Sequence, residues 1–346
     1  MDSPVIWVLE GARVGDNAQA QALARAVGGK IVVKSLVHNF FHALPNVMLG
    51  ATAATLKREA AVQLRPPWPD VVVAVGKRSA PVALWIKQQS GNLTRVVHIG
   101  RPRAALARFD LVISTPQYGL PAASNVLELQ LPMSQPVPVA AEDVSVWRDT
   151  WLTLPRPWLV AAVGGAKFPQ RLGMVELRRF GRALNDLASA QAGSVLLFDS
   201  PRSRKDALGV VSGELTVPVW RSDGVATQRD AYQAALAVGE AFVVTSDSAS
   251  MIAEMIETAR PVHVLRLPAQ TFSPRWSGRG GLGRMLSQSG LLQPPRDVLR
   301  LVDGLLNTGV VGELGVRGPT SVHSHTGESG LNRAAARVRE MLPRRN

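Results

Sequence analysis

The sequence contains no cysteine among its 346 residues. A disulfide framework, a thiolate zinc site, an iron–sulfur cluster and a cysteine nucleophile are therefore excluded together. No apolar run approaches the roughly 18–20 residues that a membrane-spanning helix needs. The first strand-like run, at residues 5–9, begins too close to Met1 to leave room for a signal or transit peptide. We therefore expect a cytoplasmic protein, or one that binds peripherally to the inner face of a membrane.

Carboxylates and aromatic residues are also scarce. The 26 Asp and Glu residues are outnumbered by 39 Lys and Arg residues, which gives a formal net charge of +13. A field of that sign attracts nucleic acid, acidic lipid headgroups or phosphorylated substrates, and charge alone does not choose among them. Aromatic residues make up 5% of the chain, and no motif for reading RNA or DNA accompanies the charge. Nucleic acid is therefore the least favoured of these partners.

Apolar runs alternate with helix-like stretches along the chain. Most of the runs are continuous in Val, Ile and Leu, which is typical of strands buried on both faces of a parallel sheet. The predicted strands of the first half are residues 5–9, 30–36, 70–75, 94–99, 109–114 and 126–131, with helices at 16–27, 51–64 and 79–89. Those of the second half are residues 158–163, 194–198, 217–220, 241–245 and 262–265. This alternation predicts an α/β fold with two doubly wound, Rossmann-like domains.

The length of the chain also favours two domains, because 346 residues exceed what one hydrophobic core usually holds. Five prolines between Pro132 and Pro157 surround one short helical stretch and indicate an inter-domain linker. A stretch rich in Gly, Ser and Thr near the end indicates a flexible connection. The predicted division is an N-terminal domain at residues 1–135, a linker at 136–157, a C-terminal domain at 158–310, a flexible segment at 311–330 and a C-terminal helix at 331–346.

The first strand-to-helix turn is a candidate ligand site, because ligands of open parallel sheets bind outside the carboxyl ends of the strands. Gly11 and Gly15 in this turn allow close backbone approach, and the start of the next helix offers free N–H groups. Asp16 at the helix start is either a plain N-cap or a functional carboxylate. The residues alone leave both interpretations open.

Cationic side chains follow two further strands of the first half. The third strand leads into Arg78 and Ser79, and the fourth leads into Arg101 and Arg103, each turn with its own glycine. Such side chains at a carboxyl edge suit an anionic ligand. A single basic turn is more often a solvated surface, but the recurrence on neighbouring strands favours an anion site.

The second domain opens with another glycine-rich exit from a strand, and its fourth strand ends in residues 245–250, where small hydroxyl side chains begin a helix. The donors at such a helix start suit a diphosphate. Glu254 shares a helical face with Ser250 and is spaced to accept hydrogen bonds from ribose hydroxyls. The alternative is an ordinary Ser/Asp cap with Glu254 exposed. The predicted nucleotide- and diphosphate-binding residues are Gly164, Gly165, Lys167, Ser246, Asp247, Ser248, Ser250 and Glu254.

Two weaker patterns do not define sites. Residues 278–283 match the GxGxxG dinucleotide motif, but no strand precedes them, and a mobile basic loop over the cleft is the preferred interpretation. His38 and His42 have a helical spacing for a metal but no third ligand nearby, so no metal site is predicted.

An apolar cluster at residues 40–49 lies near Lys57 and Arg58. One interpretation is a peripheral membrane patch whose basic neighbours attract acidic lipid. The other is a buried loop that packs on the sheet, and this second interpretation is preferred.

Several long motifs resemble the ELM (elongated mitochondria) fission family and its bacterial relatives, and together they span nearly the whole chain. They are Gly11…Gly15-Asp16…Gln19, residues 69–83 with Gly76, Arg78 and Ser79, residues 97–103 with Arg103, residues 109–113, residues 115–121 with Gln117 and Tyr118, and residues 244–254. The chain departs from the family at residues 200–204, where the family usually carries a Ser-Arg-Arg-Thr run. That departure leaves the roles of Arg202 and Arg204 unassigned.

A more distant resemblance is to the GT-B glycosyltransferases, such as the N-acetylglucosaminyltransferase that builds the lipid-linked peptidoglycan precursor. It rests on the first glycine turn with Asp16 and on the later Ser/Asp–helix–Glu254 segment. The resemblance implies two Rossmann-like domains that face each other across a cleft, with the donor nucleotide on the second domain. It also implies that the final helix crosses back to the first domain. The counterpart of Asp16 in that enzyme is usually histidine.

These features predict a metal-independent glycosyltransferase that uses a nucleotide-diphosphate sugar as a substrate, with no cofactor. Asp16 is the candidate catalytic base for an acceptor hydroxyl, and the charge suits a phosphorylated or membrane-associated acceptor. The residues predicted for the acceptor or anion side are Gly11, Gly15, Gln19, Arg78, Ser79, Arg103, Gln117 and Tyr118. One alternative is a non-catalytic adaptor, a role that the resemblance to plant ELM proteins implies. A further alternative is a sugar-nucleotide epimerase.

Overall fold

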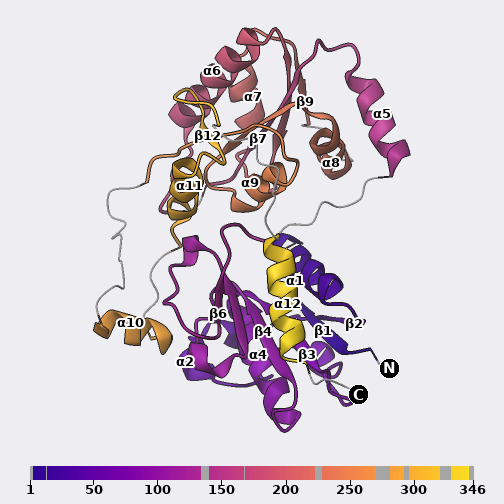
Figure 1. Cartoon of the computed structure of the whole chain (residues 1–346), viewed down its shortest axis with the longest axis vertical. Coiled ribbons are helices and arrows are strands. Elements are labelled where there is room, and N and C mark those ends of the chain that lie inside the picture. Colours follow the sequence, from indigo (N-terminus) through magenta and orange to yellow (C-terminus); the bar gives the residue numbers. More distant parts are fainter. Residues whose placement is uncertain are drawn as a thin grey trace. The chain divides into compact units, whose positions relative to one another are not determined.

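A computed structural model describes residues 3–12, 14–133, 140–166, 168–222, 228–269, 281–291, 296–319 and 329–342 (Figure 1). The chain divides into two compact units. Unit 1 is formed by residues 1–134, 275–296 and 327–346, and unit 2 by residues 135–274 and 297–326. Each unit therefore combines segments that are far apart in the sequence. None of the described helices is long and apolar enough to cross a membrane.

Unit 1 is built around a six-stranded parallel sheet in the order β2-β1-β3-β4-β5-β6. Its strands are β1 (Val5–Glu10), β2 (Lys30–Ser35), β3 (Val71–Val75), β4 (Arg95–Ile99), β5 (Leu111–Ser114) and β6 (Val126–Glu128). Ile6 of β1 lies opposite Ile31 of β2 and Val71 of β3. The strand order reverses between β1 and β3. The carboxyl ends of these two strands are therefore the place where such a sheet binds ligands.

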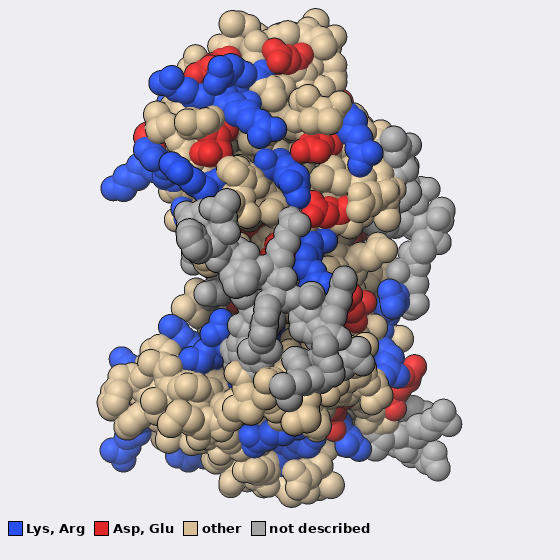
Figure 2. Space-filling view, turned by 90° about the vertical axis from the view of Figure 1, so that its left-hand side faces the viewer, with Lys and Arg blue, Asp and Glu red and all other residues tan. Residues whose placement is uncertain are grey.

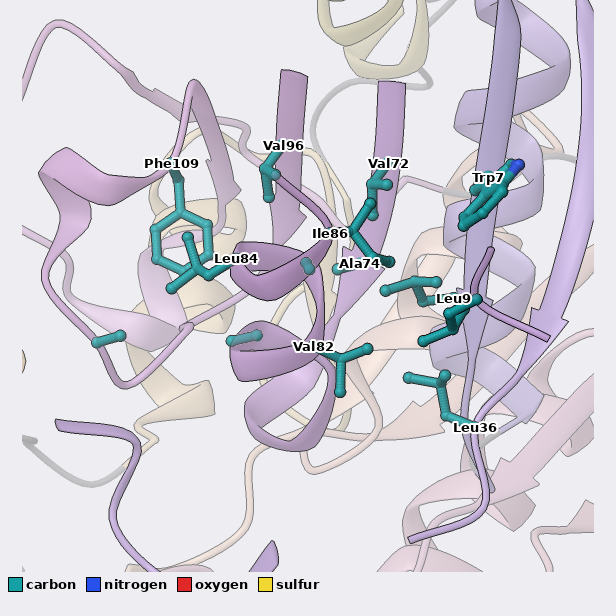
Figure 3. Packing of buried hydrophobic residues seen from close by; sticks show 14 of the residues in the cluster. Trp7, Leu9, Leu36, Val72, Ala74, Val82, Leu84, Ile86, Val96 and Phe109 are labelled. Carbon is teal, nitrogen blue, oxygen red and sulfur yellow. The ribbon is translucent and has the colours of Figure 1, made fainter. Parts of the chain in front are cut away.

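Helices cover both faces of this sheet. The helices of unit 1 are α1 (Val14–Val27), η1 (Phe40–Ala43), α2 (Asn46–Leu49), α3 (Arg58–Ala61), α4 (Gly76–Gln89), η2 (Leu106–Arg108), η3 (Pro116–Tyr118), α10 (Gly281–Gln288) and α12 (Gly330–Glu340). Because side chains alternate along a strand, Trp7 and Leu9 join the core under α4, while Ile6 and Val8 join the core under α1 and α12. Figure 3 shows the first of these clusters, with side chains of α4 gathered over the sheet.

Unit 2 has its own six-stranded parallel sheet, in the order β12-β11-β10-β7-β8-β9. Its strands are β7 (Trp158–Val163), β8 (Ser194–Asp199), β9 (Val219–Arg221), β10 (Ala241–Thr245), β11 (Val262–Leu265) and β12 (Gly312–Glu313). Its helices are α5 (Ala141–Trp151), α6 (Met174–Ala190), α7 (Ala207–Ser212), α8 (Gln228–Val238), α9 (Ala249–Ile256) and α11 (Val298–Asn307). This strand order is that of a Rossmann fold and reverses between β7 and β10. The predicted α/β fold with two Rossmann-like domains is confirmed.

The last helix, α12, returns to unit 1, as the resemblance to GT-B enzymes implies. Its buried side chains Ala334, Ala335 and Val338 belong to the same core as those of α1. The Arg339 side chain donates from Nε to the Val27 carbonyl at the end of α1, at 3.1 Å. Figure 1 shows the two helices side by side.

The helix predicted at residues 51–64 is wrong, since only the four residues of α3 are helical there. Gly50 ends α2 with a φ of 63°, a conformation that favours glycine. Thr52 then accepts a hydrogen bond from the Ala54 amide at 3.0 Å and donates its own amide to the Pro81 carbonyl at 3.0 Å. Such local bonds of a threonine side chain compete with helix formation.

The apolar cluster at residues 40–49 forms η1 and α2, and its surface is open to solvent. Phe40 is 76% exposed and Met48 is 74% exposed. The preferred interpretation of this cluster as a buried loop is therefore wrong.

Regular structure is present within the predicted linker, the predicted flexible segment and the predicted basic loop. Helix α5, inside the predicted linker, packs against α8, and the Trp151 ring lies 5.5 Å from that of Trp220. Strand β12, inside the predicted flexible segment, extends the sheet of unit 2. Helix α10 begins at Gly281, within the segment predicted as a basic loop; residues 278–280 lie outside the described residues.

Candidate functional site

The switch point of unit 2 lies where β7 and β10 end side by side. The Gly164 amide, just after β7, donates to Oγ1 of Thr245 at 2.8 Å. The Thr245 hydroxyl in turn donates to Oδ1 of Asp247 at 2.7 Å. This chain of hydrogen bonds fixes the first turn after β10 against the first turn after β7.

The two glycines of this turn are packed against protein. A Cβ added to Gly164 lies 2.3 Å from Oδ2 of Asp247, and one added to Gly165 lies 2.3 Å from the Arg202 carbonyl oxygen. Both distances are far below a normal van der Waals contact. The side-chain space of these glycines is therefore filled by neighbouring turns, although their amides stay at the carboxyl edge of the sheet.

The turn after β8 folds over the end of β7. The Ser203 hydroxyl lies 2.8 Å from the Val163 carbonyl oxygen and 2.9 Å from that of Gly164. This places Arg202, an exposed cation, next to Gly165. Arg204 is instead held by a bidentate ion pair with Asp206, at 2.9 and 2.7 Å.

Helix α9 begins directly after this network. Its N-cap, Ser248, is buried and makes no side-chain capping bond, and Ser250 in the first turn is exposed. Amide N–H groups at the start of a helix are oriented toward an anion. Ser246 does not face that anion position with a free hydroxyl, since its Oγ accepts from Gln170 Nε2 at 2.8 Å and from the Leu267 amide at 3.0 Å.

Glu254 lies on α9 beyond the first turn and is half-buried. Burial raises the pKa of its carboxyl, and Tyr232 and Arg229 beside it act in the opposite direction. Burial also raises the pKa of Tyr232, with a further contribution from the Glu254 charge. Glu254 therefore lies in a partly buried environment that an ordinary exposed helix carboxylate lacks. Lys167, the remaining predicted residue of this site, lies outside the described residues.

At the switch point of unit 1, the carboxyl ends of β1 and β3 bring Asp16 and Gly76 together. Oδ2 of Asp16 lies 3.8 Å from the position of a Cβ added to Gly76, which has a φ of 77°. Asn17 binds the glycine turn, with Oδ1 accepting from the Gly11 amide at 3.0 Å and Nδ2 donating to its carbonyl at 2.9 Å. The sequence alone does not indicate this role of Asn17. Gly15 is exposed and Gln19 is half-buried on the same helix.

The cations predicted at this edge lie near one another. Burial, Arg103 and Arg78 all lower the pKa of Lys77, in that order of importance. Burial also lowers the pKa of Arg101 to about 10, with a smaller contribution from Arg103. An anion bound between positive groups that lower one another's pKa values offsets their repulsion and stabilises their charged forms. Ser79 is separate from this group, because its buried hydroxyl donates to the Val75 carbonyl at 2.8 Å.

Gln117 and Tyr118 follow β5, and the side chain of Arg296 contacts both of them. Arg296 lies outside the motifs identified in the sequence. Arg296 donates from Nε to Oε1 of Gln117 at 2.6 Å, and its guanidinium lies 5.7 Å from the centre of the Tyr118 ring. The Tyr118 ring also contacts Gly100, where an added Cβ lies 3.4 Å from it. These residues form one cluster at the carboxyl ends of β4 and β5.

His98 is a buried group beneath this edge. Its Nε2 lies 3.1 Å from the Gly76 carbonyl oxygen, and burial lowers its pKa to about 4. The imidazole is therefore neutral at physiological pH and serves the packing of β4. Among the described residues no group of three His, Asp or Glu side chains is arranged to hold a metal ion.

Comparison with known proteins gives a family match over most of the chain. The family described as Mitochondrial fission ELM1 matches residues 14–290. The Mitochondrial fission protein ELM1 of Arabidopsis thaliana is 27% identical over 225 residues, which cover 57% of this chain and 51% of that protein. An uncharacterized protein of Rickettsia prowazekii is 33% identical over 109 residues, 31% of this chain and 30% of that protein. The chain thus spans about half or less of the length of these curated relatives.

Among solved structures, the Escherichia coli ADP-heptose lipopolysaccharide heptosyltransferase II is similar over 89% of this chain and 99% of its own, at 16% identity and a TM-score of 0.45.

Proposed function

The chain belongs to the mitochondrial fission ELM1 family, and from that premise we propose that it is a glycosyltransferase that takes its sugar from a nucleotide diphosphate. The donor binds at the switch point of unit 2. The arrangement of α9 supports this proposal more than any other observation. The helix starts at the carboxyl end of β10, next to the Gly164 turn, and its N-cap side chain leaves the first amides uncapped.

The diphosphate is the leaving group of the reaction, so it gains negative charge as the bond to the sugar breaks. The α9 amides and dipole stabilise that charge, and Arg202 beside Gly165 adds a cation at the same edge. No metal is required in this scheme. Glu254, further along α9, accepts hydrogen bonds from the ribose hydroxyls.

Unit 1 supplies the acceptor side in this proposal. The Asp16 carboxylate takes the proton of an acceptor hydroxyl, whose oxygen bonds to the sugar carbon as the electron pair of the broken bond leaves on the diphosphate. Arg78 and Arg103, the cations beside Lys77 at the carboxyl edge, hold an anionic group of the acceptor.

The experiment that tests the donor site is thermal unfolding with UDP, ADP, GDP and CMP and with their sugar conjugates. Ligand at about 100 times its dissociation constant adds roughly 2.7 kcal/mol, which gives a clear shift. In a Ser250→Asp variant the new carboxylate occupies the anion position at the α9 N-terminus, so the shift is lost while the fold is kept. Ser189→Asp, the same change at an exposed serine near the end of α6, keeps the shift.

The second candidate function is a non-catalytic adaptor that kept the fold. The inward hydrogen bonds of Ser246 and the protein-filled glycine turn favour it, because both meet structural needs without a ligand. If no nucleotide diphosphate shifts the unfolding of the wild-type protein, the adaptor replaces the transferase as the proposed function.

A further inference from the structure

Unit 1 carries an exposed apolar surface that the proposed sugar transfer does not use. Single exposed apolar residues are normal on a soluble protein, whereas a contiguous group marks a site of interaction. The rings of Phe40 and Phe41 lie 4.1 Å apart within this group. We call residues 37–48 the apolar segment, and its exposed large side chains are Val37, Phe40, Phe41, Leu44, Val47 and Met48.

Two asparagines hold the apolar segment in this outward orientation. Asn39 donates from Nδ2 to the carbonyls of Ala54 and Leu56, at 2.8 and 3.0 Å. Asn46 is 1% exposed and donates from Nδ2 to the carbonyls of Lys77 and Pro102, both at 2.7 Å. The polar side chains therefore face the protein while the apolar ones face solvent, the reverse of ordinary patterning.

Cations flank this segment at three places. The Lys57 amide donates to the Val37 carbonyl at 2.8 Å, and Nζ of Lys77 donates to the Ala43 carbonyl at 3.1 Å. Nη1 of Arg108 lies 4.0 Å from a Cβ added to Gly50, at the end of α2.

Negative charge is sparse around the segment. Between Asp16 and Glu59 the sequence contains no Asp or Glu. On the face of unit 1 at the bottom of Figure 2, Lys and Arg side chains are spread widely and Asp and Glu are few.

We propose that the apolar segment and its flanking cations bind unit 1 to a bilayer that contains anionic lipid. The side chains of η1 and α2 enter the boundary between headgroups and acyl chains, and Lys57, Lys77 and Arg108 face the lipid phosphates. The pairing of exposed apolar side chains with a predominantly basic rim fits an anionic membrane surface. This binding goes beyond the proposed sugar transfer and does not depend on it.

The first test uses the absence of native cysteine, because Met48→Cys creates a single labelling site. An environment-sensitive fluorophore at this position is expected to shift its emission to the blue with vesicles of phosphatidylcholine and about 30 mol% phosphatidylglycerol. The same label at Val175→Cys, a comparably exposed apolar position of unit 2, is expected to show no shift. No shift at position 48, or an equal shift at both positions, overturns the proposal.

The second test is co-sedimentation of the full chain with the same vesicles. The double variant Phe40→Ser/Met48→Ser is expected to lose at least about tenfold in affinity, because two apolar side chains no longer enter the bilayer. Lys57→Gln is expected to lose about fivefold, and phosphatidylcholine vesicles alone are expected to bind weakly. The control pair Phe168→Ser/Val175→Ser in unit 2 is expected to bind like wild type.

Because all four serine substitutions replace exposed side chains, the thermal midpoint of each variant checks that the fold is kept. Equal binding by the two double variants, or equal binding to neutral and anionic vesicles, contradicts the proposal. Nucleotide-dependent thermal shifts are measured on the same variants. The vesicle experiments can therefore contradict the membrane proposal without affecting the proposed donor site. The thermal shifts can likewise contradict the donor site without affecting the membrane proposal.

Discussion

The carboxylate of Asp247 occupies the space that a side chain at position 164 needs. A Cβ added to Gly164 lies 2.3 Å from Oδ2 of Asp247. The pair joins the ends of β7 and β10, because the Gly164 amide and the Asp247 carboxylate are both bound to the Thr245 hydroxyl. The packing at the switch point of unit 2 therefore requires a glycine at position 164. Its amide is used by Thr245, so Gly164 shapes the edge where the donor is proposed to bind without donating to the donor itself.

Replacing Gly164 with alanine is therefore expected to destabilise the protein. Overpacking of this kind lowers the free energy of unfolding by about 1–3 kcal/mol, which urea titration measures. Gly209→Ala is the matched control, because nothing lies within 4 Å of an added Cβ in α7. That variant is expected to gain about 0.5–1 kcal/mol. Equal stability of Gly164→Ala and wild type contradicts the packing argument.

Acid is expected to destabilise unit 1 through His98. Its folded pKa of about 4 lies below the unfolded value near 6.5, so the native state binds fewer protons than the unfolded state. The contribution of the neutral imidazole is present above the unfolded pKa and is lost as the pH falls toward 4, by up to about 3 kcal/mol. In urea titrations at falling pH, the free-energy gap between wild type and His98→Gln is expected to narrow.

The control for this pH effect is Phe109→Leu, which disturbs the ring contact to His98 at 5.4 Å but keeps the imidazole. Its free-energy gap to wild type is expected to stay constant over the same pH range. A constant gap for His98→Gln as well shows that His98 does not titrate as argued.

The strands could be predicted because their continuous apolar runs fit only one structural environment. A run such as residues 71–75, continuous in Val and Ala, is stable only where both faces of a strand are buried. The segment at residues 46–56 could not be predicted in the same way. Its conformation depends on hydrogen bonds from Asn39 and Asn46 to distant carbonyls, and no local periodicity encodes them.

The location of the candidate sites was predictable for a similar reason, because the fold decides which turns share a sheet edge. The partners of each side chain were not. Gln117 belongs to a family motif, but Arg296, which binds it, lies 179 residues away and outside every motif. The Ser246 hydroxyl is turned to Gln170 by tertiary packing, although its sequence context resembles a helix N-terminus with free donors.

Removing the Asn46 side chain is expected to loosen the apolar segment. In Asn46→Ala, the buried carbonyl of Pro102 and the partly buried carbonyl of Lys77 lose their donor. The expected loss in the free energy of unfolding is about 2–4 kcal/mol, measured by urea titration together with limited proteolysis of residues 40–49. Gln89→Ala, at an exposed helical position, is expected to change it by less than about 0.5 kcal/mol. Unchanged proteolysis of Asn46→Ala argues against the anchoring role.

Replacing Glu254 is expected to raise the stability of the protein and to weaken donor binding. Its folded pKa is raised by burial above the unfolded value, so the native state binds more protons, and stability falls as the pH rises through the folded pKa. Glu254→Gln is therefore expected to be more stable than wild type at neutral pH, with a difference that shrinks below the unfolded pKa. The same variant is expected to bind the nucleotide diphosphate about tenfold more weakly, because the amide replaces a charged acceptor for the ribose hydroxyls. Urea titration at both pH values and calorimetric titration measure the two effects separately. A variant that gains stability and keeps its affinity assigns Glu254 to the packing of α8 and α9, and removes it from the donor site.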